Sequence, residues 1–174
     1  YATIPSNALN YEGKGNLVGF GFAPEGIENN EIIYELLSDV AWTDKAITLE
    51  DWLEKYSIQR YGSYPTSIKK AYDLLNKSAF GTFTDHPMHR YQFRPYRKPE
   101  GVEDHATVHK SKEFGLAAEA FLKDAQSLKQ SNLYVYDAIE LVTQYLGLVA
   151  DQMLLDFLSA QEAGEAVSLH EIMD

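Results

Sequence analysis

The sequence predicts a mainly α-helical chain, in which a helical bundle-like domain follows an N-terminal extended segment. Apolar residues recur at intervals of three and four through much of residues 31–163, which is typical of helices that bury one face. Only one apolar run, residues 17–22, has the length and composition of a strand. Prolines and glycines gather between the periodic stretches, where turns are expected.

The stretch at residues 17–22, Leu-Val-Gly-Phe-Gly-Phe, predicts a short buried strand or an extended segment. A strand needs hydrogen-bonding neighbours, and no second strand is evident in the sequence, so we expect those neighbours to come from sequence beyond this chain. Gly19 and Gly21 would permit close approach of another backbone. A Pro-Glu-Gly corner follows and places the carboxylate of Glu25 on a tight turn three residues after the run.

Three helices are predicted next. Asn30 is suited to cap the first, Thr48 and Asp51 form a capping-box pattern for the second, and Pro65 stands near the start of the third. Gly62 is expected to end the second helix. The residues predicted to face the core are Ile32, Ile33, Leu36, Leu37 and Val40, then Leu49, Trp52, Leu53 and Tyr56, then Ile68, Ala71, Tyr72 and Leu75.

Residues 80–112 interrupt this order and predict a long irregular connection, a feature that is often functional. Helical spacing then resumes, and the longest predicted helix runs from Asn132 to Ala163 without a proline. The predicted core positions before it are Phe114, Ala117, Ala118, Phe121, Leu122 and Ala125. Those on it are Leu133, Tyr136, Ile139, Val142 or Thr143, Leu146, Val149, Met153 and Phe157.

Both ends of the chain are interpreted as cuts. The first residue is Tyr1 and not Met. Ser168 and Glu171 form a further capping-box pattern, but the chain stops at Asp174, after less than two turns of the helix that this pattern begins. Since so short a helix is marginal by itself, we expect this chain to be a piece of a longer polypeptide.

The composition limits the classes of function. The formal net charge is −11, with 26 acidic against 15 basic residues, which disfavours nucleic-acid binding because phosphates require a basic face. No apolar run reaches the roughly 20 residues that cross a bilayer, so no membrane span is predicted. The absence of cysteine excludes a disulfide scaffold and thiol chemistry.

Two features of residues 80–112 have alternative interpretations. The four histidines there, in H-x-x-H and H-x-x-x-H spacing, could bind zinc, or they could be ordinary loop residues without a metal. They are His86, His89, His105 and His109. The run His-Arg-Tyr-Gln-Phe-Arg-Pro-Tyr-Arg-Lys-Pro at 89–99 could stack on an acidic glycan, or it could be a loop whose cations offset the acidic chain.

Several segments resemble the alpha-N-acetylglucosaminidases. Residues 16–42, NLVGFGFAPEGIENNEIIYELLSDVAW, resemble the part of that family in which a strand of a TIM-like barrel delivers a glutamate in a Pro-Glu-Gly-Ile setting. The segments WLEKYSIQRYG, AYDLLNKSAF and LYVYDAIELVTQYLGLVADQMLLDFLSA resemble the helical C-terminal domain of the same enzymes. The resemblance divides the chain into the end of a catalytic barrel, 1–30, and a truncated helical domain, 31–174.

The resemblance implies a retaining glycoside hydrolase that removes terminal alpha-linked N-acetylglucosamine from glycans. Glu25 matches the catalytic nucleophile of the family, and its place just after a strand agrees with the position of catalytic residues in TIM barrels. The acid/base glutamate of the family lies upstream, in a barrel that this chain would need as its partner, so the isolated chain is expected to be inactive. No cofactor and no metal are implied.

The resemblance also implies a cellular location. The bacterial enzymes are exported and the animal ones are lysosomal, and the lack of cysteine favours a secreted or periplasmic bacterial protein. Two other classes of protein remain open at this stage. One is a non-catalytic, all-helical interaction module in which residues 1–30 dock on a partner, and the other is a helical protein that binds metal through its histidines.

Overall fold

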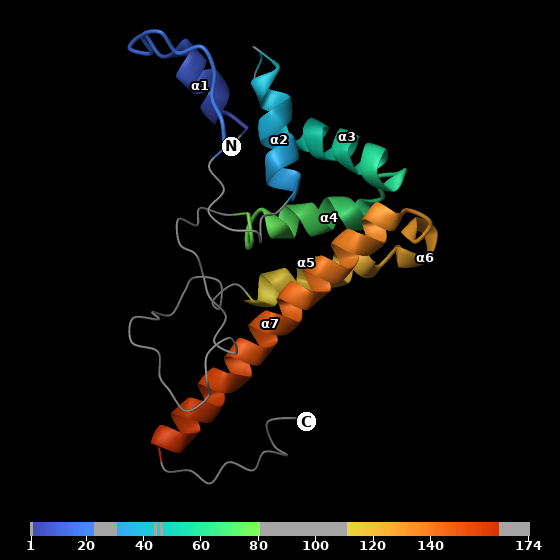
Figure 1. Cartoon of the computed structure of the whole chain (residues 1–174). Coiled ribbons are helices and arrows are strands. Elements are labelled where there is room, and N and C mark those ends of the chain that lie inside the picture. Colours follow the sequence, from blue (N-terminus) through green and yellow to red (C-terminus); the bar gives the residue numbers. More distant parts are fainter. Residues whose placement is uncertain (1, 23–30, 44, 46, 81–110, 164–174) are drawn as a thin grey trace. The chain divides into compact units, whose positions relative to one another are not determined.

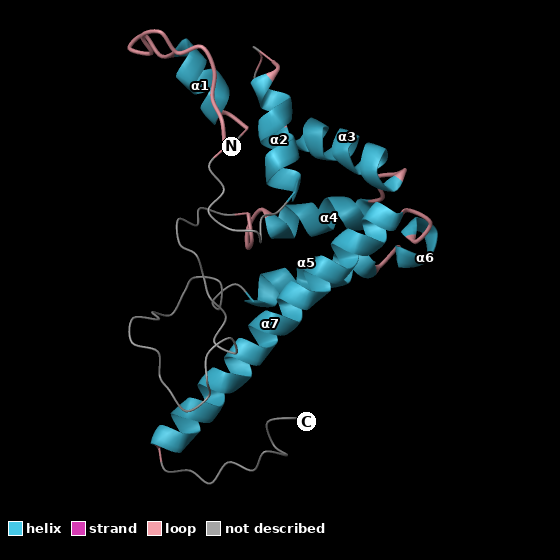
Figure 2. Cartoon of the chain, in the orientation of Figure 1, coloured by secondary structure: helices cyan, strands magenta, loops and turns pink. Residues whose placement is uncertain are grey.

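The computed structural model describes residues 2–22, 31–43, 45, 47–80 and 111–163. It divides into two compact units, Tyr1–Tyr56 and Ser57–Asp174, which we describe separately. Within the described residues all regular secondary structure is helical and no strand is present, which confirms the predicted fold class (Figure 2).

Seven helices are described along the chain (Figure 1). Their bounds are α1 Ile4–Asn10, α2 Glu31–Ala41, α3 Leu49–Tyr61, α4 Thr66–Leu75, α5 Ser111–Leu122, α6 Ala125–Leu128 and α7 Asn132–Glu162. The helix α1 was not predicted from the sequence, although Pro5 in its first turn is a common feature of helix starts. None of the described helices combines the length and the hydropathy that a membrane crossing requires.

The first unit is held together by α1, α2 and the first turns of α3. One face of α2 is buried through Ile32, Leu36 and Val40, as the sequence predicted. The indole Nε1 of Trp52 donates a hydrogen bond of 2.7 Å to Asp39 Oδ2 and so ties α3 to α2. The Trp52 ring also stacks on Tyr56, with ring centroids 5.0 Å apart. The stacking orients the Trp52 ring within α3, and the hydrogen bond from its indole joins the start of α3 to α2.

The segment at residues 17–22 is not a buried strand. It has no regular secondary structure, and its large apolar side chains are exposed, with Val18 98%, Phe20 40% and Phe22 44% accessible. The predicted burial was wrong because a strand is buried only by neighbouring strands, and the described residues contain none. The alternative prediction, an extended segment, is the one that the structure bears out.

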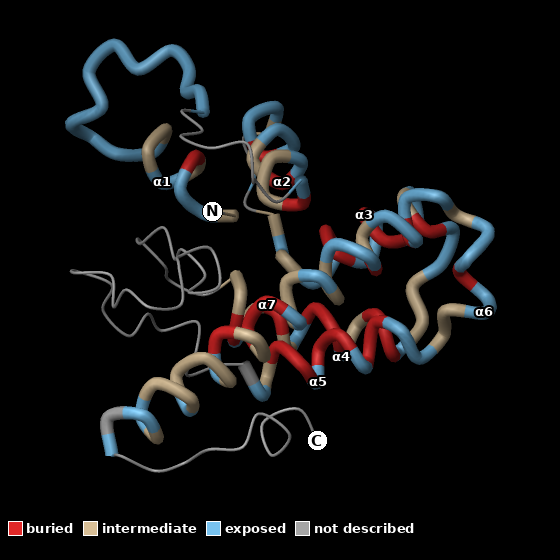
Figure 3. The backbone as a smooth tube through the Cα atoms, turned by 60° about the horizontal axis from the view of Figure 1, so that its bottom comes forward, coloured by how far each residue is buried: buried red, intermediate tan, exposed pale blue. Residues whose placement is uncertain are grey.

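The core of the second unit lies where α4 packs on α5 and α5 packs on α7 (Figure 3). Its centre is aromatic: Phe121 and Tyr134 stack with centroids 5.1 Å apart, and Tyr61 meets both rings edge-on at 5.7 Å. The hydroxyl of Tyr134 donates to the backbone oxygen of Phe121 at 2.8 Å, so this buried polar atom is satisfied. The aromatic cluster joins the end of α3 to α5 and α7.

The predicted helix ends in the second unit are confirmed. Gly62 follows α3 with φ +86°, a left-handed conformation that suits glycine, and its amide donates to the oxygen of Ile58 at 2.9 Å. Pro65 is the residue before α4. The start of α7 at Asn132 was predicted as well, but its cap was not: the side chain of Ser131 accepts from the amide of Tyr134.

The buried face of α7 differs from the predicted one. Four residues assigned to the core are exposed: Leu133 48%, Tyr136 60%, Ile139 62% and Leu146 59%. The residues that are buried on α7 are instead Tyr134, Ala138, Gly147, Leu148 and Asp151. The helix is apolar on two sides, so periodicity alone could not tell which side packs on α5. On α5, Leu122 was also assigned to the core, and it is 41% exposed at the last position of the helix.

Close approach of α5 and α7 depends on a glycine. A Cβ added at Gly115 would lie 2.7 Å from Cε2 of Tyr145 and 2.9 Å from its Cζ. Such distances are too short for carbon atoms, so the ring of Tyr145 occupies the space that a side chain at residue 115 would need.

We predict that Gly115→Ala gives the second unit little net gain in stability, because the added methyl must displace the far end of the Tyr145 side chain and this offsets the gain in helix propensity. In a Tyr145→Ala background the same change should stabilise the protein by about 1 kcal/mol, because alanine is the better helix former. Urea unfolding of the four proteins measures both effects. If Gly115→Ala changed the free energy of unfolding equally in the two backgrounds, the contact with the Tyr145 ring would not determine its effect.

Candidate functional site

The residues to which the sequence assigned chemistry lie outside the described residues. These are Glu25, the four histidines His86, His89, His105 and His109, and the basic and aromatic run at 89–99. The structure does describe the chain on both sides of Glu25, namely the extended segment that ends at Phe22 and the helix α2 that begins at Glu31.

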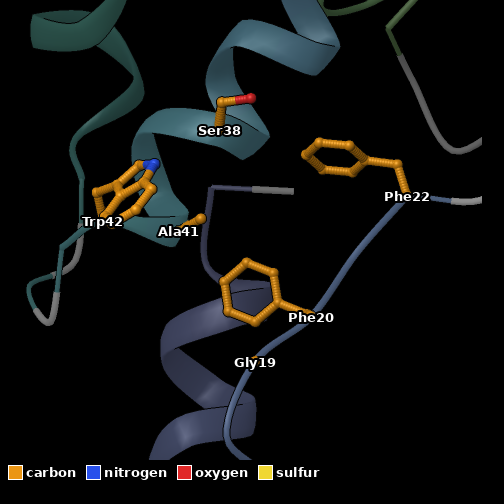
Figure 4. A pocket seen from close by; sticks show the side chains of 6 residues that line it. All are labelled: Gly19, Phe20, Phe22, Ser38, Ala41 and Trp42. Atoms are coloured by element: carbon orange, nitrogen blue, oxygen red, sulfur yellow. The ribbon is translucent and has the colours of Figure 1, made fainter.

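A pocket of about 250 Å³ lies beside this extended segment (Figure 4). It is lined by Gly19, Phe20, Phe22, Ser38, Ala41 and Trp42, which come from the segment and from the C-terminal half of α2 with the residue after it. Phe22 is oriented by Tyr34, whose ring meets it edge-on with centroids 5.6 Å apart. Trp42 is 92% exposed.

The lining of this pocket offers apolar contact and little chemistry. Among the described residues that line it, the polar side-chain groups are the hydroxyl of Ser38 and the indole Nε1 of Trp42, and none is a carboxylate, histidine or lysine. The described lining therefore offers no general acid or base. Aromatic rings that are exposed in such numbers are typical of a surface that packs against other protein.

The main polar cluster of the second unit joins three helices. Arg60 donates from Nε to Asp137 Oδ2 at 2.6 Å and from Nη2 to Oδ1 at 2.7 Å. Tyr61 donates its hydroxyl to Asp137 Oδ2 at 2.7 Å and lies 2.8 Å from the hydroxyl of Tyr72. The side chains of Arg60 and Asp137 are only 10% and 15% exposed. The cluster thus connects the end of α3 with α4 and α7.

The electrostatics of the cluster indicate a structural role. Burial raises the pKa of Tyr61 far above its ordinary value, and the neighbouring Tyr72 and Asp137 raise it further. Burial also raises the pKa of Tyr72. Both tyrosines therefore stay neutral at physiological pH, and the carboxylate of Asp137 is occupied by three donated hydrogen bonds. These groups hold the end of α3, α4 and α7 together.

Comparison with known proteins decides the family. The alpha-N-acetylglucosaminidase (NAGLU) C-terminal domain model matches residues 52–173. The chain belongs to the alpha-N-acetylglucosaminidase family. The tim-barrel domain model of the same family matches residues 1–44, and this match includes Glu25. The two matches meet between residues 44 and 52, later in the chain than the division after residue 30 expected from the sequence.

A curated relative is the alpha-N-acetylglucosaminidase of Homo sapiens. The two sequences are 26% identical over 154 residues, which cover 88% of this chain and 21% of the relative. The chain thus spans about a fifth of the length of the curated relative it matches.

Solved structures of a family 89 glycoside hydrolase from Clostridium perfringens are also similar. One, with two glutamates replaced by glutamine and in complex with its substrate GlcNAc-alpha-1,4-galactose, has a TM-score of 0.78 and 28% identity and covers 92% of this chain and 19% of that chain. A complex with 2-acetamido-1,2-dideoxynojirmycin has the same TM-score and identity and covers 98% and 20%. A complex with PUGNAc has a TM-score of 0.77 and 29% identity and covers 94% and 19%.

Sequence reasoning missed Asp137 as a residue of interest. A signal was present, because Asp137 lies between Tyr134 and Ala138 on a helix that is otherwise apolar there. An acidic residue at such a position is rarely buried unless it is paired. Arg60, which precedes Tyr61 and Gly62 in a segment that resembles the family, is the partner that the sequence could not assign.

We predict that Asp137→Ala destabilises the protein by about 3 to 5 kcal/mol, because it removes the carboxylate that accepts two hydrogen bonds from the largely buried guanidinium of Arg60. The double variant Arg60→Met with Asp137→Leu should lose much less than the sum of the two single variants, because no buried charge is stranded. Urea unfolding at neutral pH measures the coupling.

A matched control is the exposed pair of Lys69 and Asp73, whose side chains are 42% and 56% exposed and whose charged atoms lie 3.9 Å apart. Asp73→Ala should change the free energy of unfolding by no more than about 0.5 kcal/mol. If the double variant lost as much stability as the two single variants together, the interpretation that Arg60 and Asp137 are energetically coupled would be contradicted.

We also predict that stability falls as the pH rises above about 10, the ordinary tyrosine pKa. The unfolded chain then releases the protons of Tyr61 and Tyr72, whereas the folded protein keeps them because both folded pKa values are raised. Each tyrosine contributes up to about 1.4 kcal/mol per pH unit in this window. Urea unfolding between pH 8.5 and 11 gives the slope.

The variant Tyr72→Phe removes one of these groups and should flatten that slope. Tyr136→Phe serves as the control, because Tyr136 is 60% exposed and its replacement should leave the slope unchanged. Equal slopes for the wild type and Tyr72→Phe would mean that Tyr72 does not link stability to alkaline pH.

Proposed function

We propose that this chain is part of a retaining glycoside hydrolase that removes terminal alpha-linked N-acetylglucosamine from glycans, with Glu25 as its nucleophile. The observation that carries the proposal is the pair of family matches, in which the barrel match at residues 1–44 includes Glu25 and is followed by the helical match at 52–173. These matches favour enzyme parentage over a free-standing helical interaction module.

Two further observations support the assignment. The similar hydrolase from Clostridium perfringens was solved with its substrate GlcNAc-alpha-1,4-galactose after two glutamates had been replaced by glutamine. Such a pair of changes fits a reaction that depends on two carboxyl groups. Glu25 also follows an extended apolar segment by three residues, and TIM barrels carry their catalytic residues where strands end.

In the proposed reaction a carboxylate oxygen of Glu25 attacks the anomeric carbon of the N-acetylglucosamine. The bond to the leaving sugar breaks, and a second carboxylic acid gives its proton to the leaving oxygen. Water, deprotonated by that second carboxylate, then attacks the anomeric carbon of the glycosyl-Glu25 ester, displaces the Glu25 carboxylate and releases the sugar with its α configuration retained. Retaining enzymes hold the two carboxyl groups about 5 to 5.5 Å apart.

The second carboxylic acid is assigned to an upstream barrel that forms one polypeptide with this chain. We therefore propose that the isolated chain has no activity. Residues 1–30 belong, in this proposal, to the end of the barrel, and 31–174 to the helical domain. An enzyme of this kind acts on glycans after secretion or in the periplasm if it is bacterial, and in the lysosome if it is animal.

The test uses the full-length protein that contains this chain and an aryl alpha-N-acetylglucosaminide as substrate. Glu25→Ala should lower kcat by about a thousandfold or more, because the covalent route is lost. Azide should restore turnover and give a β-glycosyl azide, because the small anion enters the space left by the nucleophile. Glu28→Gln is the matched control and should retain activity.

The configuration of the azide product separates the possible roles of Glu25. An α-glycosyl azide would mean that Glu25 is the acid/base residue, since azide would then attack the covalent intermediate from the other side. Full turnover by Glu25→Ala would remove the residue from the mechanism altogether. Turnover by the isolated 174-residue chain would refute the need for an upstream carboxyl group.

A further inference from the structure

The first turn of α2 contacts the segment that leads to Glu25. Residues 23–30, which include Glu25, lie outside the described residues, and in the sequence they connect Phe22 to Glu31, the first residue of α2. The ring of Tyr34 meets the ring of Phe22 edge-on, with an interplanar angle of 88° and centroids 5.6 Å apart. Tyr34 follows Glu31 by three residues, which is about 4.5 Å along the helix axis. The two described ends of this connection are therefore both attached to one turn of α2.

The ring contact constrains the chain more than the length of the connection does. The chain from residue 22 to residue 31 could span about 30 Å if it were fully extended. The contact with Tyr34 keeps Phe22 much closer to α2 than this limit. Residues 18–22 have no regular secondary structure, and within the described part of the chain no strand lies beside them. In that part of the chain, side-chain packing against α2 is what sets the position of Phe22.

The helix that carries Tyr34 is itself fixed within the first unit. Its buried face includes Leu36 and Val40, which are 5% and 3% exposed. Nearer its C-terminus, Asp39 accepts a hydrogen bond of 2.7 Å from the indole of the buried Trp52. A side chain on such a helix can serve as a support, because the position of its own backbone is already determined by packing.

We propose that Tyr34 is a positioning residue for the nucleophile. Its ring holds Phe22, and thereby the point from which the chain continues to Glu25 three residues later. The proposal rests on the proposed role of Glu25 as the nucleophile. Attack requires reacting atoms about 3 to 3.5 Å apart, and a misplacement of about 1 Å can cost on the order of a hundredfold in rate. The contact with Phe22 is made by the ring, so phenylalanine can take the place of Tyr34 in this role.

The test compares variants of the full-length protein that contains this chain, with an aryl alpha-N-acetylglucosaminide as substrate. Tyr34→Ala should lower kcat/KM about tenfold or more, because the attack by Glu25 is slowed. The inhibition constant of free N-acetylglucosamine should change by less than about twofold, because positioning the nucleophile does not alter sugar binding. Tyr34→Phe should retain kcat/KM within about twofold. Phe22→Ala should match Tyr34→Ala, and the double variant should be no worse than either single variant.

A matched control is Val40→Ala, which removes buried methyl groups from the same helix at a residue that is 3% exposed and six positions from Tyr34. It should lower the urea midpoint and leave kcat/KM unchanged. If kcat/KM fell in both Val40→Ala and Tyr34→Ala in proportion to the loss of stability, Tyr34 would have only a structural role and the proposal would be overturned. Wild-type kcat/KM in Tyr34→Ala would also overturn it.

Azide separates this proposal from the role of Glu25 itself. In the Glu25→Ala variant with azide no carboxylate has to be positioned, so adding Tyr34→Ala should change the azide-dependent turnover by less than about twofold. A loss there as large as in the parent background would mean that Tyr34 shapes the sugar site, which contradicts the proposal. Full turnover by Glu25→Ala without azide would instead refute the nucleophile assignment on which the proposal rests.

Discussion

The buried ion pair of Arg60 and Asp137 constrains how α7 sits in the second unit. A carboxylate that is 15% exposed is stable only if its charge is matched, and Asp137 meets that condition through two bonds from Arg60 and one from Tyr61. Hydrophobic burial alone does not choose a face of α7, because the helix is apolar on two sides. We infer that the ion pair makes that choice, since Asp137 reaches Arg60 only when Tyr134 and Ala138 face inward.

The rest of the core follows from this orientation. With Tyr134 facing inward, its ring stacks on Phe121 and its hydroxyl satisfies a backbone oxygen of α5. Gly115 then allows α5 to approach the ring of Tyr145. The same rotation turns Ile139 and Leu146 outward, so the apolar surface that α7 presents is a direct result of the buried pair. The cluster thus determines which apolar residues of α7 are buried and which are exposed.

In the first unit, by contrast, several large apolar side chains are not packed into an interior. Val18, Phe20 and Trp42 are exposed, and the extended segment at 17–22 has no strand beside it within the described residues. The family match explains this composition, because residues 1–44 correspond to part of a barrel domain. In a barrel, neighbouring strands satisfy the backbone of such a segment and bury its side chains. The chemistry assigned to Glu25 depends on the same neighbours, which fix the distance between two carboxyl groups.

The sequence by itself determined the helical class, the places of α2 to α5 and α7, and the candidate nucleophile, but it did not predict α1 or α6. Caps and glycines such as Gly62 and Ser131 act locally, and the Pro-Glu-Gly-Ile motif is a contiguous pattern, so each can be recognised without knowledge of the fold. Only the tertiary structure decided which face of α7 is buried, that residues 17–22 are exposed, and that Asp137 pairs with Arg60. These outcomes depend on groups that are distant in sequence, and periodicity carries no information about which distant surface covers a given apolar face.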